Sequence, residues 1–283
     1  MGQDRVRIGV VAPASRLEPT TAEAVLQLAE ALYPARPPEL YFSPQCFLSS
    51  GHFAGDDETR ARAFLEVAND ERFDALWFAR GGYGSCRLAE RLLPQLAETA
   101  RRKTYLGYSD AGFLLAGMYK AGFARLAHGP MPADIGRPGG DAAIKRALSF
   151  LVGGAADTLE ATVSPKKPTV AFNITVLSHL LGTPLEPDLS GHIVMLEEVA
   201  EAMYRIDRAL FQITSNAAMR GVAGIMLGRC SAIPANQPDF QKSEEEVARY
   251  WCGRSRIPYL GRADIGHDAD NKIVPFGRWH AHG

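Results

Sequence analysis

In the first half of this 283-residue chain, short apolar runs alternate with amphipathic segments, and few residues are left over for linkers. The runs are rich in β-branched and aromatic residues and are too short for helices, so they predict strands. Repeated strand–helix units of this length are typical of a parallel sheet with right-handed crossovers and helices on both faces. The expected strands are Val6–Ala12, Glu39–Phe42, Phe73–Ala79, Thr104–Tyr108 and one around Ala124–His128.

The segments between these runs carry apolar residues at helical spacing, preceded by polar residues of the kind that cap helices. Thr20 or Thr21 is expected to cap the first helix. Ligands of such sheets bind at the carboxyl ends of the strands, where the turns into the helices lie. The expected helices are Ala22–Leu32, one opened by Asp56 and Asp57, Ser85–Leu96, one beginning after Ser109, and Asp141–Leu151.

Periodicity lapses from Gly153 to Pro168, where Gly-Gly, Ser-Pro and Lys-Lys-Pro clusters are typical of a link between domains. We therefore predict an N-terminal α/β domain over 1–152, a linker over 153–169 and a smaller mixed α+β domain over 170–283. The elements expected in the last part are a helix Ile174–Leu181, a strand His192–Leu196, a helix Tyr204–Met219, a strand Val222–Leu227, a helix Glu244–Trp251, and extended segments near Tyr259 and at Lys272–Pro275.

The charge balance argues against a polyanionic partner. The formal net charge is −1 and neither sign forms a block, so no nucleic-acid or membrane partner is predicted. No apolar run approaches membrane-spanning length, and the first residues lack a secretion-signal pattern, so we expect a cytoplasmic protein. The cysteines show no C-x-x-C spacing and the histidines no H-E-x-x-H pattern, so we expect reduced thiols, no metal and no cofactor.

The strand expected at Thr104–Tyr108 leads into Ser109 and then into an apolar run of helical pattern. A sharp turn of this kind lifts a side chain above the edge of the sheet and directs helix amides toward it. Ser109 is therefore a candidate nucleophile. The G-x-S-x-G pattern is only half present, because Gly107 matches its first glycine and Ala111 replaces its second. The alternative is that Ser109 or Asp110 is only the N-cap of the helix.

A serine nucleophile needs a base, and the base needs an orienting carboxylate. His267 follows a glycine, which lets the backbone pass close to another segment. Glu197 ends the buried run Ile193–Leu196, where a charge is expected only if something pairs with it. The alternatives are a hydrogen-bonded loop histidine and a structural ion pair of Glu197 with Arg205 or Arg208.

The strand expected at Phe73–Ala79 is followed by the glycine-rich turn Arg80–Gly84. Backbone N–H groups exposed at the N-terminus of a helix suit an oxyanion hole, a carboxylate or a phosphate. Nucleotide binding is disfavoured, because Arg87 stands where the third glycine of G-x-G-x-x-G belongs and the G-x-x-x-x-G-K-[ST] pattern is absent.

Five blocks follow one another along the chain: Arg80–Gly84 with Arg87, Gly107–Asp110, His128–Met131, Leu196–Glu201 with Tyr204, Asp207, Arg208 and Leu210, and Gly266–His267 with Asn271 and Pro275–Gly277. In these residues the chain resembles the LD-carboxypeptidases, the serine peptidases of the S66 family, which trim peptidoglycan tetrapeptides. The blocks span almost the whole chain and keep the order and spacing of the family.

The resemblance implies a triad in which Ser109 is the nucleophile, Glu197 the orienting acid and His267 the general base. Glu198 is a rival for the acid, but the first acid of the block aligns with Glu197. The implied reaction is hydrolysis of the L,D peptide bond that releases terminal D-Ala from murein tetrapeptide during peptidoglycan recycling. The resemblance also suggests a homodimer.

For the oxyanion hole, the resemblance implies the amide of Asp110 and one from Gly81 or Gly82. The free carboxylate of the D-residue needs a partner of its own. Arg80 and Arg87, at the glycine-rich turn, are candidates because a guanidinium binds a carboxylate through two parallel hydrogen bonds.

The chain departs from the family pattern at two places. Family members often have Gly-Gly-Asn before the central helix, where this chain has Ala171-Phe172-Asn173. They often have Ile-Thr after the Ser-Asp pair, where this chain has Ala111-Gly112. Both departures are expected to alter the pocket wall rather than the triad. One alternative function is that of a microcin-immunity amidase, which cleaves an acyl-nucleotide conjugate, although the added aromatic loop of those proteins is not evident in this sequence. The other is a non-catalytic anion-binding module.

Overall fold

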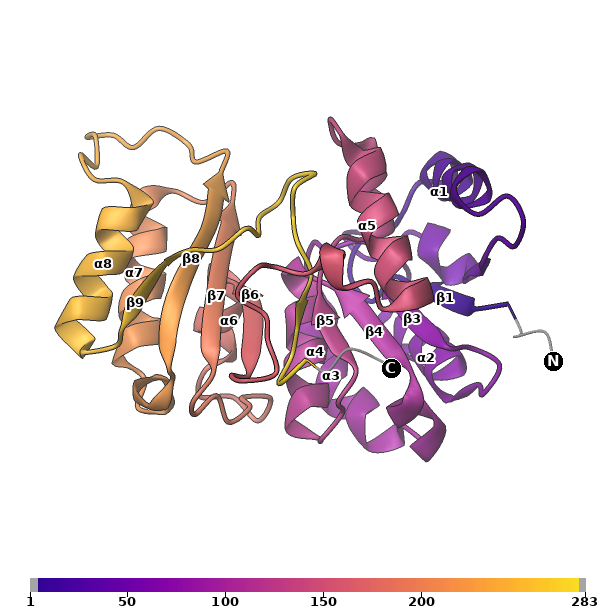
Figure 1. Ribbon diagram of the computed structural model, residues 1–283, viewed down its shortest axis with the longest axis horizontal. Helices are drawn as coiled ribbons and strands as arrows, with labels where there is room; N and C mark the ends of the chain where they lie inside the picture. The colour runs from indigo at the N-terminus through magenta and orange to yellow at the C-terminus, as the bar shows by residue number, and fades with distance from the viewer. Residues whose placement is uncertain (1–4, 280–283) are drawn as a thin grey trace.

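The computed structural model describes residues 5–279, in which two sheets lie side by side (Figure 1). The first sheet has the strand order β10-β5-β4-β3-β1-β2 and is parallel except for β10, which runs antiparallel to β5. Its strands are β1 (Arg7–Val11), β2 (Glu39–Phe42), β3 (Ala75–Phe78), β4 (Thr104–Gly107), β5 (Leu126–His128) and β10 (Val274–Pro275).

Helices cover both faces of this sheet, as predicted. Alternate residues of β3 face opposite sides: Leu76 and Phe78 pack into one apolar cluster, and Ala75 and Trp77 into another. The helices divide between these clusters, with α1 (Pro19–Leu32) and α5 (Gly140–Gly153) on the Trp77 face and α2 (Asp57–Asn69), α3 (Ser85–Leu92) and α4 (Gly112–Lys120) on the Phe78 face.

The second sheet is parallel throughout, in the order β6-β7-β8-β9. It is therefore more regular than the mixed α+β pattern predicted. Its three helices pack on one face in the same apolar cluster as α2–α4, while the other face is covered by the segment that leads from β9 back toward β10. The elements are β6 (Thr169–Asn173), α6 (Ile174–Leu180), β7 (Ile193–Val199), α7 (Met203–Ser215), β8 (Gly224–Ser231), α8 (Glu244–Ser255) and β9 (Tyr259–Arg262).

Three local predictions were wrong. Neither Thr20 nor Thr21 caps α1, which begins at Pro19 with Glu18 before it, because the fixed φ of proline suits a first helical position. The helix predicted for Ser85–Leu96 ends at Leu92, where Pro94 follows in a 3₁₀ turn. The strand β6 was not predicted, because its five residues follow directly on the cluster interpreted as a linker.

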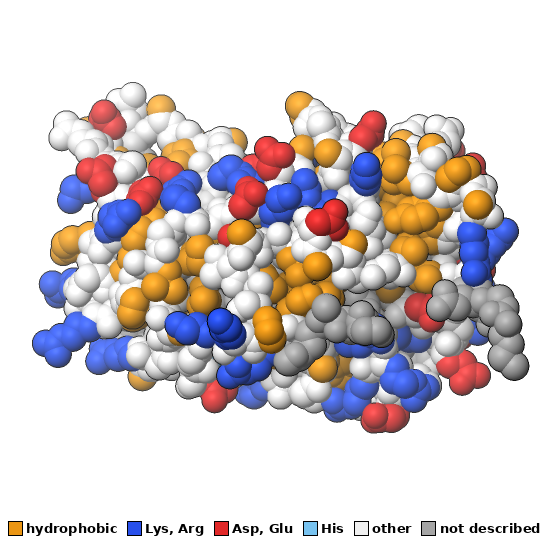
Figure 2. All heavy atoms as spheres, in the orientation of Figure 1, with side chains coloured by type: hydrophobic (Ala, Val, Ile, Leu, Met, Phe, Trp, Pro, Cys, Tyr) orange, Lys and Arg blue, Asp and Glu red, His pale blue; other side chains and the backbone are white. Residues whose placement is uncertain are grey.

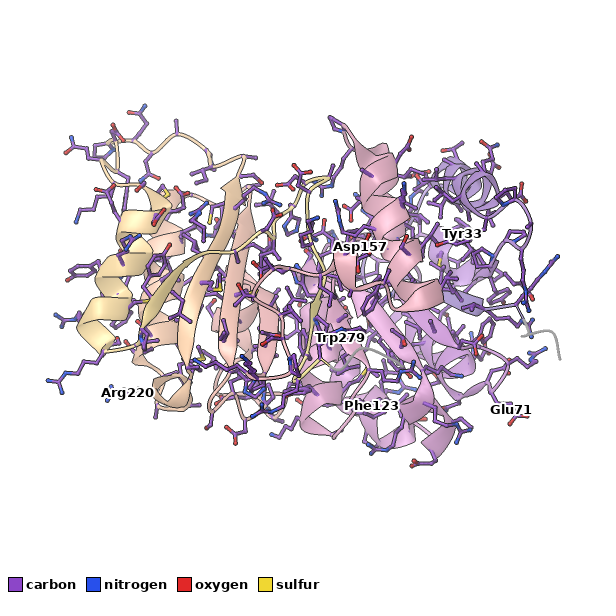
Figure 3. All side chains as sticks on the ribbon, in the orientation of Figure 1. Tyr33, Glu71, Phe123, Asp157, Arg220 and Trp279 are labelled. Atoms are coloured by element: carbon purple, nitrogen blue, oxygen red, sulfur yellow. The ribbon has the colours of Figure 1, made fainter. Side chains whose placement is uncertain are left out.

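The chain crosses between the two sheets twice. After β9 it returns to the first sheet as β10, and Thr169 of β6 exchanges two backbone hydrogen bonds with Gly277 just beyond β10. Side chains from both halves fill the junction (Figure 3): the Phe172 and Phe276 rings lie 5.2 Å apart between centroids, and the Tyr119 hydroxyl lies 2.7 Å from Nε2 of His192. The predicted boundaries at 152 and 170 stay a prediction.

The surface carries charges of both signs. On the face seen in Figure 2, Lys and Arg side chains are interspersed with Asp and Glu, in keeping with the net charge of −1. Within residues 5–279, none of the helices combines the length and apolar character that crossing a membrane requires.

Candidate active site

Ser109 stands at a sharp turn where β4 ends. Its φ of +58° lies in the left-handed region, which non-glycine residues adopt rarely and at a cost of roughly 1–3 kcal/mol. The 3₁₀ turn Ser109–Ala111 follows, and α4 begins at Gly112 with Ala111 as its N-cap. Neither Ser109 nor Asp110 caps α4 through its side chain, so the alternative of a plain helix cap is wrong.

Gly81 lies directly against Ser109. A Cβ atom at Gly81 would be 2.8 Å from Ser109 Oγ and 2.9 Å from Ser109 Cβ, so only glycine fits without displacing the serine. Gly82 has φ +117°, and a side chain there would overlap Ser15. The glycine-rich turn thus brings its backbone to the serine hydroxyl, as an oxyanion hole requires.

Asp110 joins this turn to the serine turn through its side chain. Its Oδ2 accepts a hydrogen bond from the Ser85 amide at 2.9 Å, at the N-terminus of α3. The carboxyl group is buried, and burial raises its pKa. The side chain therefore has a role that the sequence did not indicate, besides the backbone N–H that the resemblance assigned to it.

Glu197 and His267 contact each other, and both lie in the second half of the chain. Glu197 Oε2 lies 2.5 Å from His267 Nδ1, and the Glu197 side chain is completely buried on β7. Burial opposes charge on the imidazole, but the negative charge and hydrogen bond of Glu197 outweigh it and hold the pKa of His267 above its ordinary value. The predicted alternative, an ion pair with Arg205 or Arg208, is not what the structure contains: Arg205 pairs with Glu201, and Arg208 lies over the Tyr204 ring.

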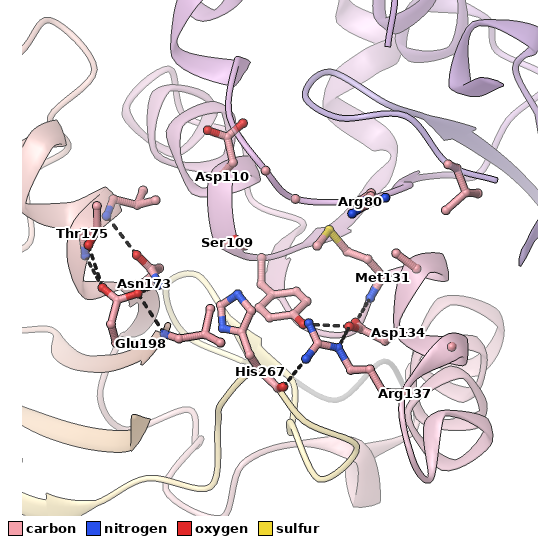
Figure 4. Close-up of a pocket in the computed structure, with 18 of the residues that line it drawn as sticks. Arg80, Ser109, Asp110, Met131, Asp134, Arg137, Asn173, Thr175, Glu198 and His267 are labelled. Carbon is pink, nitrogen blue, oxygen red and sulfur yellow. Dashed lines mark hydrogen bonds and ion pairs between the residues drawn. The ribbon is translucent and has the colours of Figure 1, made fainter. Parts of the chain in front are cut away.

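Glu198 points to the other side of β7, as successive residues of a strand do. Its Oε1 accepts a hydrogen bond from Asn173 Nδ2 at 2.5 Å, and its Oε2 accepts two from the amide and hydroxyl of Thr175 (Figure 4). Burial raises the pKa of Glu198. The rival carboxylate is thus held at the start of α6, whereas Glu197 contacts the histidine.

One cavity of about 650 Å³ lies between the two sheets and is bordered by Gly81, Ser109 and His267. Ser109 and His267 both line this cavity, although they come from different halves of the chain (Figure 4). Glu197 lies behind His267, away from the wall. Among the predicted site residues, those that line the cavity are Arg80, Gly81, Gly82, Ser109, Asp110 and His267, and the rival carboxylate Glu198 lines it as well.

The two candidate arginines differ in position. Arg80 lines the cavity, and its guanidinium donates a hydrogen bond to the carbonyl of Arg16 at 3.2 Å. Arg87 lies outside the cavity, where it forms an ion pair with Asp57 at 2.7 Å. The expectation that Arg87 is a carboxylate partner at this site is therefore wrong, because Asp57 already occupies its guanidinium.

The cavity wall also contains residues that were not predicted as part of the site, among them Tyr108, Asp134 and Arg137. Asp134 Oδ1 accepts hydrogen bonds from the Tyr108 hydroxyl and from Arg137 Nε, both at 2.8 Å. Arg137 also donates to the carbonyl of His267 at 2.5 Å (Figure 4). The bond from Arg137 to His267 joins residues 130 positions apart through a main-chain oxygen, which no side-chain pattern marks. The one signal in the sequence for Asp134 and Arg137 was their proximity to the His128–Met131 block.

The arrangement suits acyl transfer. It combines a hydroxyl on a strained turn, an imidazole oriented by a buried carboxylate, and backbone N–H groups of a glycine-rich turn. Within the described part of the chain, no group of three or more His, Cys, Asp or Glu side chains is placed to hold a metal ion.

Comparison with known proteins gives matches over both halves. Residues 8–129 match the model of the LD-carboxypeptidase N-terminal domain, and residues 168–281 that of the LD-carboxypeptidase C-terminal domain. A putative carboxypeptidase of Synechocystis sp. is 33% identical, covering 96% of this chain and 89% of that protein. The murein tetrapeptide carboxypeptidase of Pseudomonas aeruginosa is 24% identical, covering 96% and 91%.

Solved structures show the same fold. The crystal structure of muramoyltetrapeptide carboxypeptidase from Oxalobacter formigenes matches with a TM-score of 0.75 and 25% identity, covering 95% of this chain and 93% of that one. The microcin C7 self-immunity protein MccF, in complex with aspartyl sulfamoyl adenosine, matches with a TM-score of 0.79 and 19% identity, covering 96% and 91%.

Proposed function

Because this chain belongs to the LD-carboxypeptidase family, we propose that it is a serine carboxypeptidase that releases the terminal D-alanine of a murein tetrapeptide. The observation that carries the proposal is the placement of Ser109 and His267 on one cavity, with Glu197 hydrogen-bonded to the far side of the imidazole. A binding module has no use for a strained serine and a histidine oriented by a buried carboxylate.

In the proposed mechanism, His267 Nε2 takes the proton of Ser109 as its Oγ attacks the carbonyl of the L,D peptide bond. Glu197, bonded to Nδ1, leaves Nε2 as the nitrogen that acts on the serine, and stabilises the imidazolium that forms. The oxyanion is bound by the amides of Asp110 and of Gly81 or Gly82. His267 then gives its proton to the departing amine of D-alanine, and water, deprotonated by the same histidine, hydrolyses the acyl-enzyme.

Arg80 is the proposed partner of the D-alanine carboxylate. It lines the cavity beside Gly81 and Gly82, and among residues 5–279 its guanidinium has one hydrogen-bond acceptor, the carbonyl of Arg16, so it can bind a further acceptor. A planar guanidinium binds a carboxylate through two parallel hydrogen bonds, which favours a free C-terminus over an amide.

The test is release of D-alanine from purified murein tetrapeptide by wild type and variants. Ser109→Ala is expected to lower kcat on the order of 10⁴- to 10⁶-fold, and Glu197→Gln by about 10²- to 10⁴-fold. Glu160→Gln is the control, since Glu160 is a buried carboxylate outside the cavity that accepts a hydrogen bond from the Thr162 amide. A Ser109→Ala variant with full activity would overturn the mechanism.

Two other functions give different results. MccF has the same fold, so hydrolysis of an aminoacyl sulfamoyl adenosine in preference to the tetrapeptide would favour a microcin-immunity amidase. An anion-binding module would not form a covalent adduct with a fluorophosphonate at Ser109. A peptidase is expected to give the adduct and to lose it in Ser109→Ala.

We further propose that the protein acts in the cytoplasm, in peptidoglycan recycling, as a homodimer. The murein tetrapeptide carboxypeptidase name of the Pseudomonas relative supports the substrate. Accumulation of tetrapeptide in the cytoplasm of a deletion strain and the mass of the protein in solution test these proposals.

A further inference from the structure

His267 and Ser109 come from different halves of the molecule, and the bond between Glu197 and His267 does not link those halves. Glu197 lies on β7 of the second sheet and His267 in the segment that leads from β9 to β10, and their hydrogen bond sets the orientation of the imidazole ring. Ser109 belongs to the turn after β4 in the first sheet. Contacts between the His267 segment and the first half of the chain, such as the bonds from Arg146 to the carbonyls of Ala269 and Asn271, set its distance from Ser109.

Arg137 supplies such a contact. It follows a 3₁₀ turn, Pro132–Gly136, that belongs to the first half of the chain, and its guanidinium donates to the carbonyl of His267. Its Nε donates to Asp134, whose side chain is only 4% exposed. The planar guanidinium thus joins a fixed carboxylate on one side of the cavity to the backbone of His267 on the other.

The same carboxylate also holds the residue before Ser109. The hydroxyl of Tyr108 donates to Asp134 at 2.8 Å, and the Tyr108 ring packs on the His267 ring with centroids 4.7 Å apart. Asp134 accepts a third bond from the amide of Met131 at 2.8 Å, which fixes the carboxylate itself. One buried carboxylate therefore links the serine turn to the arginine that binds His267.

The charge of Arg137 also affects the pKa of His267. Burial lowers this pKa, and the nearby carboxylate of Glu197 raises it. Arg137 lowers it further, and Asp134 raises it. Tyr108 and His128 also lie near the His267 ring. Burial lowers the pKa of His128 to about 3, so its imidazole is neutral.

We propose that Arg137 is a positioning residue that holds the His267 loop against Ser109 through Asp134. This inference rests on the proposed role of His267 as the base. Arg137→Gln removes the charge and the paired bonds. Arg137→Lys keeps the charge, but a single ammonium group cannot reproduce the two fixed directions of the guanidinium.

The experiment compares these variants with Arg101→Gln, which removes an arginine that also donates to a main-chain carbonyl, that of Ala121, far from the cavity. Both Arg137 variants are expected to lower kcat about 10- to 100-fold with little change in KM, because misplacement of the base by about 1 Å is enough. The acid limb of the kcat/KM profile is expected to move to higher pH in Arg137→Gln and to stay in Arg137→Lys.

Titration of the His267 ring by NMR in substrate-free protein gives a readout independent of activity. The expected result is a higher pKa of His267 in Arg137→Gln and an unchanged one in Arg101→Gln. Three results would overturn the proposal: an unchanged His267 titration in Arg137→Gln, wild-type kcat in Arg137→Lys, or a rise in KM alone, which would make Arg137 a substrate ligand. A wild-type protein without peptidase activity would refute the proposed function, while the titration would still decide the placement of His267.

Discussion

Glu197 Oε2 lies 2.5 Å from Nδ1 of His267, although 70 residues separate them along the chain. The carboxylate is completely buried, so it has no solvent to compensate for the loss of its partner. The bond therefore governs both the chemistry and the pH response of the imidazole.

Replacement of Glu197 by Gln is expected to reverse the pKa shift of His267. With the charge of Glu197 gone, burial and Arg137 act without a strong opposing group, so the pKa falls below the ordinary value of about 6.5. The acid limb of kcat/KM moves to lower pH while the maximal rate drops. If the acid limb does not move, His267 is not the group whose titration produces the acid limb of the kcat/KM profile.

The same substitution changes how stability depends on pH. In the wild type the pKa of His267 is raised in the folded state, so its contribution to stability is fully present below the ordinary pKa of about 6.5 and is lost as pH rises through the raised value. In Glu197→Gln the lowered pKa makes the contribution of His267 increase with pH. Urea unfolding of both proteins across pH 5.5 to 8.5 checks the sign.

Substitution of Gly81 by Ala is expected to lower kcat about 10- to 100-fold with little loss of stability. The new methyl group would lie 2.8 Å from Ser109 Oγ, so the hydroxyl must move away from its attacking position. Gly153→Ala is the control, because a Cβ there meets nothing within 4 Å. Equal kinetics in the two variants would contradict the close approach of the glycine-rich turn to the serine.

Truncation of Asp110 is expected to weaken the fold. Asp110→Ala leaves the buried amide of Ser85 without its acceptor, at a cost of about 1–3 kcal/mol in the free energy of unfolding. Asp110→Asn keeps an acceptor oxygen and should lose less. Denaturant unfolding measures both variants, and equal losses would mean that the hydrogen bond to Ser85 is not the cause.

The two arginines near the glycine-rich turn form a matched pair. Arg80→Ala is expected to raise KM about tenfold for peptides with a free C-terminus and to have less effect on C-terminal amides. The reason is that the proposed partner of Arg80 is the C-terminal carboxylate of the peptide, which an amide lacks. Arg87→Ala is expected to leave KM unchanged, since Asp57 occupies its guanidinium outside the cavity. Steady-state kinetics on both peptide forms decides between them.

Most of the first sheet was predictable because its strands are short apolar runs ended by glycine or polar residues, and the predicted strand Glu39–Phe42 has the bounds of β2. β6 was missed for a physical reason. The run Thr169–Asn173 is short and follows the Lys-Lys-Pro cluster, and its strand character depends on pairing with β7, which local sequence does not specify.

The site was predictable only in part. The resemblance to the LD-carboxypeptidases indicated Ser109, Glu197 and His267, and the family is confirmed, while the roles of these residues stay a prediction. The contact of Arg137 with His267 uses a main-chain oxygen, which every residue carries, so no side-chain pattern marks it. The interaction of the Asp110 carboxylate with Ser85 was missed for a similar reason, because its donor is the main-chain amide of Ser85.

The return of the chain to its first sheet has a consequence for synthesis on the ribosome. β10 pairs with β5, and Thr169 is bonded to Gly277, so the edge beside β5 stays open until the last part of the described chain has been translated. The His267 loop emerges just before β10. A nascent chain that has not yet reached this loop therefore carries the serine turn without His267, the proposed base.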